Sequence, residues 1–162
     1  MFVRSHIVAA AALTAAVGFV APAAPAAAET PFKSRLTAHA VFVPTSTPGV
    51  LAGTVSGAGH ATHLGRVTLA TTEIIDFASS PGTLLILDGR MVMVAANGDE
   101  LRWSYSGTGT LPPDADGNIA LSGTFVITGG TGRFSDASGS GTFTGVGGPS
   151  SASVYYLGTI TY

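Results

Sequence analysis

The chain has 162 residues, no cysteine and a formal net charge of −2 at pH 7. A length of this order suits one compact domain, and the lack of cysteine excludes both a disulfide framework and a cysteine nucleophile. The weakly acidic balance disfavours nucleic acid and anionic membrane surfaces as partners, because both are bound through basic patches.

The first 28 residues are typical of a secretory signal peptide. A short positive segment precedes an uncharged apolar core over residues 7–20, and small residues follow up to an expected cleavage after Ala28. A membrane anchor is the alternative, but the apolar core is shorter than the ~20 residues of a spanning helix, and Pro22 follows it directly. We therefore expect a secreted protein, extracellular or periplasmic, whose single domain is residues 29–162, with no membrane contact after cleavage.

The domain consists of short β-like runs separated by turn signals. Pro48-Gly49 and Gly57-Ala58-Gly59 interrupt the first runs, and residues 73–80 fit either the end of a strand or one helical turn. Asp88-Gly89 is a two-residue hairpin signal between two apolar runs. The expected strands are residues 36–43, 50–56, 61–72, 83–87, 90–96, 101–108, 119–128, a run ending at 146, and 152–162.

Side-chain alternation along these runs predicts an all-β fold. Trp103 and Tyr105 share one face with Arg102 on the opposite one, and residues 119–128 alternate with Phe125 on the apolar face. About eight strands joined by tight turns favour an antiparallel up-and-down meander, which loses its exposed edges by closing into an eight-stranded barrel. A two-sheet β-sandwich is the alternative architecture.

A glycine-dense segment, Ile127-Thr128-Gly129-Gly130-Thr131-Gly132-Arg133-Phe134, joins two of the later strands. Glycine reaches positive φ without steric cost, so Gly129, Gly130 and Gly132 predict a tight structural turn. The segment is not a phosphate-binding loop, because it lacks the Gly-Lys-Ser/Thr ending and leads into a strand.

With Ala137, Gly139 and Gly141, this segment resembles the glycine corner of the allene oxide cyclase and dirigent superfamily. Residues 61–66 and 96–101 are similar to stretches of bacterial secreted relatives that have an allene-oxide-cyclase-like barrel. The resemblance spans roughly residues 53–146 and implies a calycin-like barrel of eight antiparallel strands, in a protein that forms dimers or trimers. It implies no assigned chemistry for the bacterial relatives, and the acidic and tyrosyl pocket residues of the plant cyclases and dirigent proteins have no matched positions here.

Four residues are candidates for ligand binding: His63, Arg102, Trp103 and Tyr105. As a neutral imidazole His63 can accept a proton, but it can equally form a hydrogen bond that holds the bend at Leu64 and Gly65. Trp103 and Tyr105 belong to the core or to a ligand cage. Arg102 faces solvent if apolar residues fill the barrel, and the lumen if the interior is polar.

We expect neither a metal site nor a cofactor. His60 and His63 point to opposite faces of a strand unless a turn lies between them, and no third ligand stands at a metal-binding spacing. Glu73 and Asp76 can form a carboxylate pair for acid–base chemistry, but their spacing fixes no distance between them.

Three functions remain open for such a barrel. The first hypothesis is a non-catalytic protein that binds a small apolar or aromatic molecule at one barrel mouth. The second is a cofactor-free isomerase or cyclase of the allene oxide cyclase type, which requires a desolvated carboxylate or histidine in the lumen. The third is a structural or interaction module with a filled barrel. The filling and polarity of the lumen distinguish the three.

Overall fold

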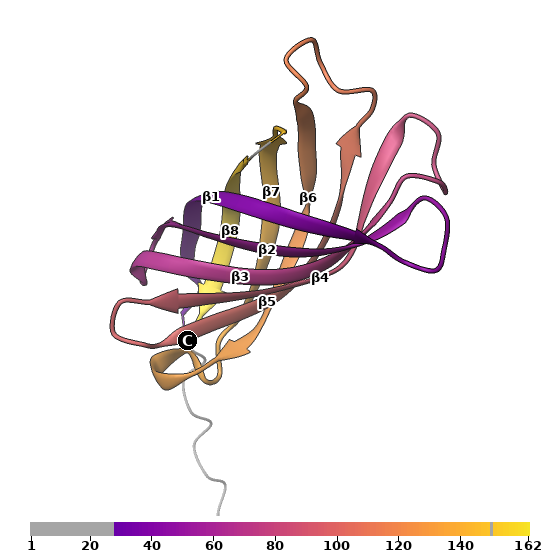
Figure 1. The fold of residues 1–162 in the computed structure, drawn as a ribbon. Coiled ribbons are helices and arrows are strands. Elements are labelled where there is room, and N and C mark those ends of the chain that lie inside the picture. The colour runs from indigo at the N-terminus through magenta and orange to yellow at the C-terminus, as the bar shows by residue number, and fades with distance from the viewer. Residues whose placement is uncertain (1–27, 150) are drawn as a thin grey trace, which may run out of the picture.

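A computed structural model describes residues 28–149 and 151–162; the expected signal peptide, apart from Ala28, lies outside them. Eight antiparallel strands form a closed barrel in chain order, with β1 pairing with β8 (Figure 1). The predicted eight-stranded up-and-down barrel is therefore confirmed, and the β-sandwich alternative is wrong. The strands are β1 (Thr30–Pro44), β2 (Val50–Ala61), β3 (Gly65–Asp76), β4 (Thr83–Ala95), β5 (Glu100–Thr110), β6 (Ile119–Gly130), β7 (Ser138–Gly147) and β8 (Ala152–Thr161).

The predicted hairpin at Asp88-Gly89 is wrong, because β4 runs through both residues as one strand. The register of β4 on β5 shifts between Ile86 and Gly89, and Asp88 has a φ of 49°. The Asp-Gly pair thus marks a β-bulge, which bends a strand without reversing it.

The predicted break at Gly57-Ala58-Gly59 is also wrong, since β2 continues through it. These glycines serve close packing against β1: a Cβ on Gly59 would lie 2.1 Å from the carbonyl oxygen of Arg35. The turn comes later, at residues 62–64, and β3 extends to Asp76, which settles the ambiguous segment 73–80 as a strand end followed by a loop.

The two ends of the barrel differ. At the end that we call the closed end, the turns after β2, β4 and β6 meet the start of β1 and the end of β8 (Figure 1). The predicted glycine turn lies here and ends in the short 3₁₀ helix η1 (Gly132–Phe134), with Gly129 and Gly132 at φ of 117° and 58°. Phe134 is fully buried and covers this end.

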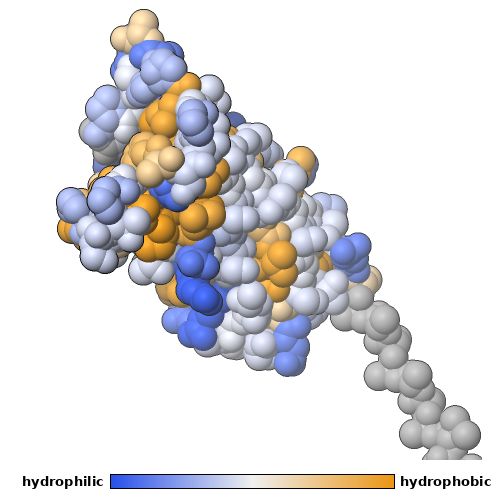
Figure 2. All heavy atoms as spheres, turned by 90° about the vertical axis from the view of Figure 1, so that its right-hand side faces the viewer, coloured by the Kyte–Doolittle hydropathy of each residue, from blue (hydrophilic) through white to orange (hydrophobic). Residues whose placement is uncertain are grey.

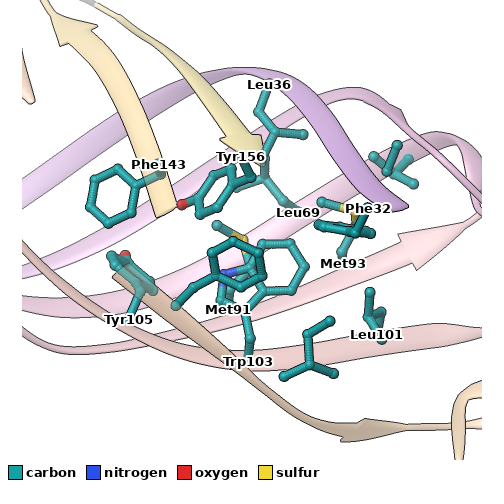
Figure 3. Close-up of a cluster of buried hydrophobic side chains, with 14 of the residues drawn as sticks. Phe32, Leu36, Leu69, Met91, Met93, Leu101, Trp103, Tyr105, Phe143 and Tyr156 are labelled. Atoms are coloured by element: carbon teal, nitrogen blue, oxygen red, sulfur yellow. The ribbon is translucent and has the colours of Figure 1, made fainter. Parts of the chain in front are cut away.

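Aromatic side chains fill the half of the barrel next to the closed end (Figure 3). Phe32, Trp103, Phe125 and Tyr156 are buried, and their ring centroids lie 5.2–5.9 Å apart in five neighbouring pairs. Trp103, Tyr105 and Phe125 all lie in the core, so the apolar faces of β5 and β6 point into the barrel. This packing forms a rigid floor for the opposite half of the barrel.

In the part of the chain that the structure describes, no helix is long and apolar enough to cross a membrane.

Candidate functional site

A cavity of about 360 Å³ occupies the half of the barrel opposite the closed end, which we call the open end. The loops after β1, β3, β5 and β7 surround this end, and hydrophobic atoms gather between them in the upper left of Figure 2. All eight strands contribute lining residues, most of them apolar, such as Leu36, Val55, Leu69, Ile86 and Leu121.

The cavity exists because small residues replace large ones on neighbouring strands. Ala38 of β1 lies in register between Gly57 of β2 and Ala152 of β8, so three adjacent positions carry almost no side chain. Ala38 and Ala152 both line the cavity. The same strands carry Phe32 and Tyr156 in the filled half, and the change in side-chain size leaves space at one end only.

One polar cluster lies within this apolar lining, formed by Thr71 and Glu73 of β3 and Tyr105 of β5. The Tyr105 hydroxyl donates a hydrogen bond to Glu73 Oε2 at 2.6 Å and lies 2.8 Å from Thr71 Oγ1. Since the single proton of Tyr105 is committed to the carboxylate, Thr71 donates to Tyr105. The cluster is a directed chain of donors that ends on Glu73.

Burial raises the pKa of Glu73 above its ordinary value, and the hydrogen bond from Tyr105 offsets part of this rise. Burial and then the nearby Glu73 charge raise the pKa of both Tyr105 and Tyr156, which therefore stay neutral at physiological pH. Figure 3 shows the hydroxyl groups of these two tyrosines on the side of the cluster next to Phe143. The site combines neutral hydroxyl groups with one carboxyl group whose charge is destabilised by burial.

Among the described lining residues, Glu73 is the only one that carries a formal charge. The ion pairs of the described chain lie elsewhere, between Arg102 and Glu100 and between Arg133 and Asp99. The Glu73 carboxylate thus has one hydrogen-bond donor, the Tyr105 hydroxyl, and takes part in neither ion pair of the described residues.

The structure brings one of the four predicted ligand-binding residues, Tyr105, to the cavity. Trp103 lies in the filled half and packs against Phe32, Phe125 and Tyr156. Arg102 is on the outer face, where it pairs with Glu100 at 2.5 Å.

His63 lies at the closed end, far along the barrel from the cavity lining, in the turn after β2. Its Nε2 is 3.0 Å from the carbonyl oxygen of Pro31, and its ring contacts Tyr162 at 5.4 Å. Its backbone carbonyl accepts a hydrogen bond from Arg133. These contacts tie the β2–β3 turn to the start of β1 and to the glycine turn.

Glu73 and Asp76 have different partners and do not act as a pair. Asp76 accepts hydrogen bonds from the backbone N–H groups of Ala78 and Ser79 and from the Ser79 hydroxyl, which hold the β3–β4 loop and lower its pKa. Among the described residues, no three His, Asp or Glu side chains gather as a metal site.

Sequence reasoning did not select Glu73 as a cavity residue, although a signal was present. Val67, Leu69 and Thr71 alternate inward along β3, and the same period continues to Glu73 and Ile75. A glutamate in register with an inward apolar series indicates a carboxyl group that faces the lumen.

A scan against protein-family models found no match, and searches of curated proteins and of solved structures found none either.

Proposed function

We propose that the barrel binds one small apolar molecule in the cavity at its open end, with the polar part of the ligand against the Glu73–Tyr105–Thr71 cluster. The observation that carries this proposal is the division of the barrel into a filled half and an apolar half with an open cavity. Pockets of this size that combine an apolar lining with a few convergent polar groups are typical ligand sites.

The construction of the site supports binding of a ligand rather than mere incomplete packing. The lining residues stand on eight paired strands, and the aromatic floor below them is buried, so the cavity keeps its shape without a ligand. A preformed pocket costs little ordering on binding. The Glu73 cluster supplies the specific polar contact that an empty packing defect would lack.

Binding can be tested with the uncharged fluorophore N-phenyl-1-naphthylamine, whose emission rises in apolar surroundings. We expect saturable binding to the wild type, and loss of binding in Ala38→Phe, because the new ring enters the space beside Gly57 and Ala152. Ala58→Phe is the matched control, since Ala58 is on the outer, exposed face of β2. Equal binding by both variants, at unchanged melting temperature, would contradict the proposal.

Native mass spectrometry of protein taken from the culture medium gives an independent test. We expect a retained small molecule that is lost on denaturation and absent from Ala38→Phe. The same spectrum would show whether cleavage occurs after Ala28 and whether the protein forms dimers or trimers, both of which stay predictions.

A cofactor-free isomerase or cyclase, as the resemblance to allene oxide cyclases suggests, is the second candidate. The observation that favours it is the Glu73 carboxyl group in an apolar cavity, since a raised pKa suits a proton acceptor that works near neutral pH. In an isomerisation Glu73 takes a proton from one ligand atom and the proton returns to another, without a co-reactant. Incubation of the retained ligand in heavy water should then add deuterium with the wild type and not with Glu73→Gln.

A further inference from the structure

The charge of the cavity indicates which polar group its ligand carries. We propose that the ligand is an apolar amine, bound with its protonated nitrogen against the Glu73 carboxylate; this rests on the proposed ligand-binding function. Three independent parts of the structure support an amine: the missing counter-charge, the direction of the hydrogen bonds, and the aromatic rings in the cavity.

The first part is the missing counter-charge. Glu73 is the only formally charged residue among the described residues that line the cavity, and neither ion pair found among the described residues includes it. A half-buried carboxylate in an apolar cavity is less well solvated than one in water, and a cation placed beside it recovers part of that loss. An ammonium group on the ligand supplies this partner, whereas a carboxylate on the ligand would add a second negative charge to the same apolar space.

The second part is the direction of the hydrogen bonds. Thr71 donates to Tyr105 and Tyr105 donates to Glu73 Oε2, so both protein donors are already committed toward the carboxylate. The other oxygen, Oε1, has no hydrogen-bond partner among the described residues. An ionised carboxylate only accepts hydrogen bonds, so the ligand group that meets Oε1 must be a donor. Ketone, ether and carboxylate groups do not meet this requirement.

The third part is the set of aromatic rings that line the same cavity as the carboxylate. Tyr105 and Phe143 meet edge to face at 5.9 Å, and Phe143 packs on Tyr156 at 5.4 Å. At the mouth, a Cβ on Gly53 would lie 2.6 Å from the Phe42 ring and 3.1 Å from Glu73 Cγ, so the Phe42 ring and the Glu73 stem lie side by side over that glycine. Aromatic faces attract an ammonium group more than a neutral hydroxyl group. The rings therefore favour an amine over an alcohol.

The experiment compares three ligands with the same eight-carbon tail: octylamine, 1-octanol and octanoate. The affinity of each ligand is measured by its displacement of N-phenyl-1-naphthylamine at pH 7. At this pH octylamine is protonated and octanoate is ionised. We expect octylamine to bind about ten-fold more tightly than 1-octanol, as one charge-assisted hydrogen bond contributes, and octanoate to bind most weakly.

Glu73→Gln is the decisive variant, because the amide keeps one carbonyl oxygen as an acceptor for Tyr105 but removes the charge and replaces the other acceptor oxygen with an NH2 donor. We expect it to reduce the affinity for octylamine about ten-fold and to leave the affinity for 1-octanol within about two-fold. Asp136→Asn is the matched control, since it removes one exposed negative charge near the glycine turn and should change neither affinity.

If 1-octanol binds as tightly as octylamine, or if Glu73→Gln leaves octylamine binding unchanged, the amine proposal is overturned while ligand binding by the cavity stands. If none of the three displaces the fluorophore and Ala38→Phe still binds it, the proposed function fails as well. A measurement on the wild type avoids dependence on the folding of the variant: octylamine should lower the pKa of Glu73, observed by carboxyl NMR, and 1-octanol should not. An unchanged pKa with bound octylamine would overturn the proposal.

Discussion

The Tyr105 hydroxyl donates a hydrogen bond of 2.6 Å to Glu73 across the strands β3 and β5, inside an apolar cavity. The two strands are not neighbours, because β4 lies between them. The bond is therefore made through the lumen and not along the barrel wall. Closure of the sheet converts two residues separated by 32 positions in sequence into one polar unit.

Removal of this donor should change the charge equilibrium of Glu73. In Tyr105→Phe, burial still raises the pKa of the carboxyl group, but the hydrogen bond that opposes the rise is gone. We expect the pKa of Glu73 to increase further and the free energy of unfolding to fall by about 1–3 kcal/mol, since Thr71 and Glu73 lose their partner. Carboxyl NMR and urea denaturation measure the two effects. Tyr155→Phe, on the outer face, should change neither, and a lower pKa in Tyr105→Phe would refute this account.

The aromatic floor should carry much of the stability of the barrel. Phe125 is 1% exposed and contacts the rings of Phe32, Trp103 and Tyr156, whereas its neighbour Val126 is 53% exposed. We expect Phe125→Ala to lower the free energy of unfolding by about 3–5 kcal/mol, and Val126→Ala by less than about 0.5 kcal/mol. Urea denaturation of both variants tests the assignment of faces along β6. A similar loss in both would show that the assignment is wrong.

The fold was predictable because side-chain alternation and turn signals are local properties. Trp103, Tyr105 and Phe125 follow a period of two that the sequence displays directly. The errors occurred where a local signal has two meanings. Asp88-Gly89 fits a hairpin and a bulge equally well, and only the pairing of β4 with both neighbours distinguishes them.

The site was less predictable than the fold, because alternation gives the face of a residue and not its height along the barrel. Trp103 and Tyr105 share one face of β5, yet one lies in the packed floor and the other lines the cavity. The height depends on the tilt of the strands and on where small residues on other strands, such as Ala38 and Gly57, leave space. These relationships join residues far apart in sequence, and no local pattern records them.

The β3–β4 loop at the open end should depend on the ionised form of Asp76. The Ser79 hydroxyl and the backbone N–H groups of Ser79 and Ala78 hold the pKa of Asp76 below its ordinary value of 3.8. A carboxyl group with a lowered pKa stabilises the folded state at pH values above its ordinary pKa. This contribution disappears as the pH falls through the pKa that the group has in the folded state. We therefore expect Asp76→Ala to lower the melting temperature at pH 6 and to have a smaller effect below pH 3. Thermal denaturation at the two pH values measures this, and an effect that grows at low pH would contradict it.

Glu73 should act on stability in the opposite sense. Unfolded, it titrates near its ordinary value of 4.5, whereas burial raises its pKa in the folded chain. At pH values between the unfolded and the folded pKa of Glu73, the folded state binds more protons than the unfolded state. The free energy of unfolding therefore falls as the pH rises from about 4.5 through the folded pKa. The two titratable side chains that line the cavity with Glu73, Tyr105 and Tyr156, have raised pKa values and do not titrate in this window.

Glu73→Gln should remove this dependence on pH. As the pH rises from 4.5 to 7.5, the free energy of unfolding of the variant should therefore increase relative to that of the wild type. Urea denaturation of both proteins across this range measures the difference, and the contributions of all other groups cancel. Since Asp76 and Asp114 have lowered pKa values, they act below the window and do not imitate the effect. A difference that stays constant over the whole range would mean that Glu73 titrates alike in the folded and unfolded chains, and that the cavity does not desolvate it.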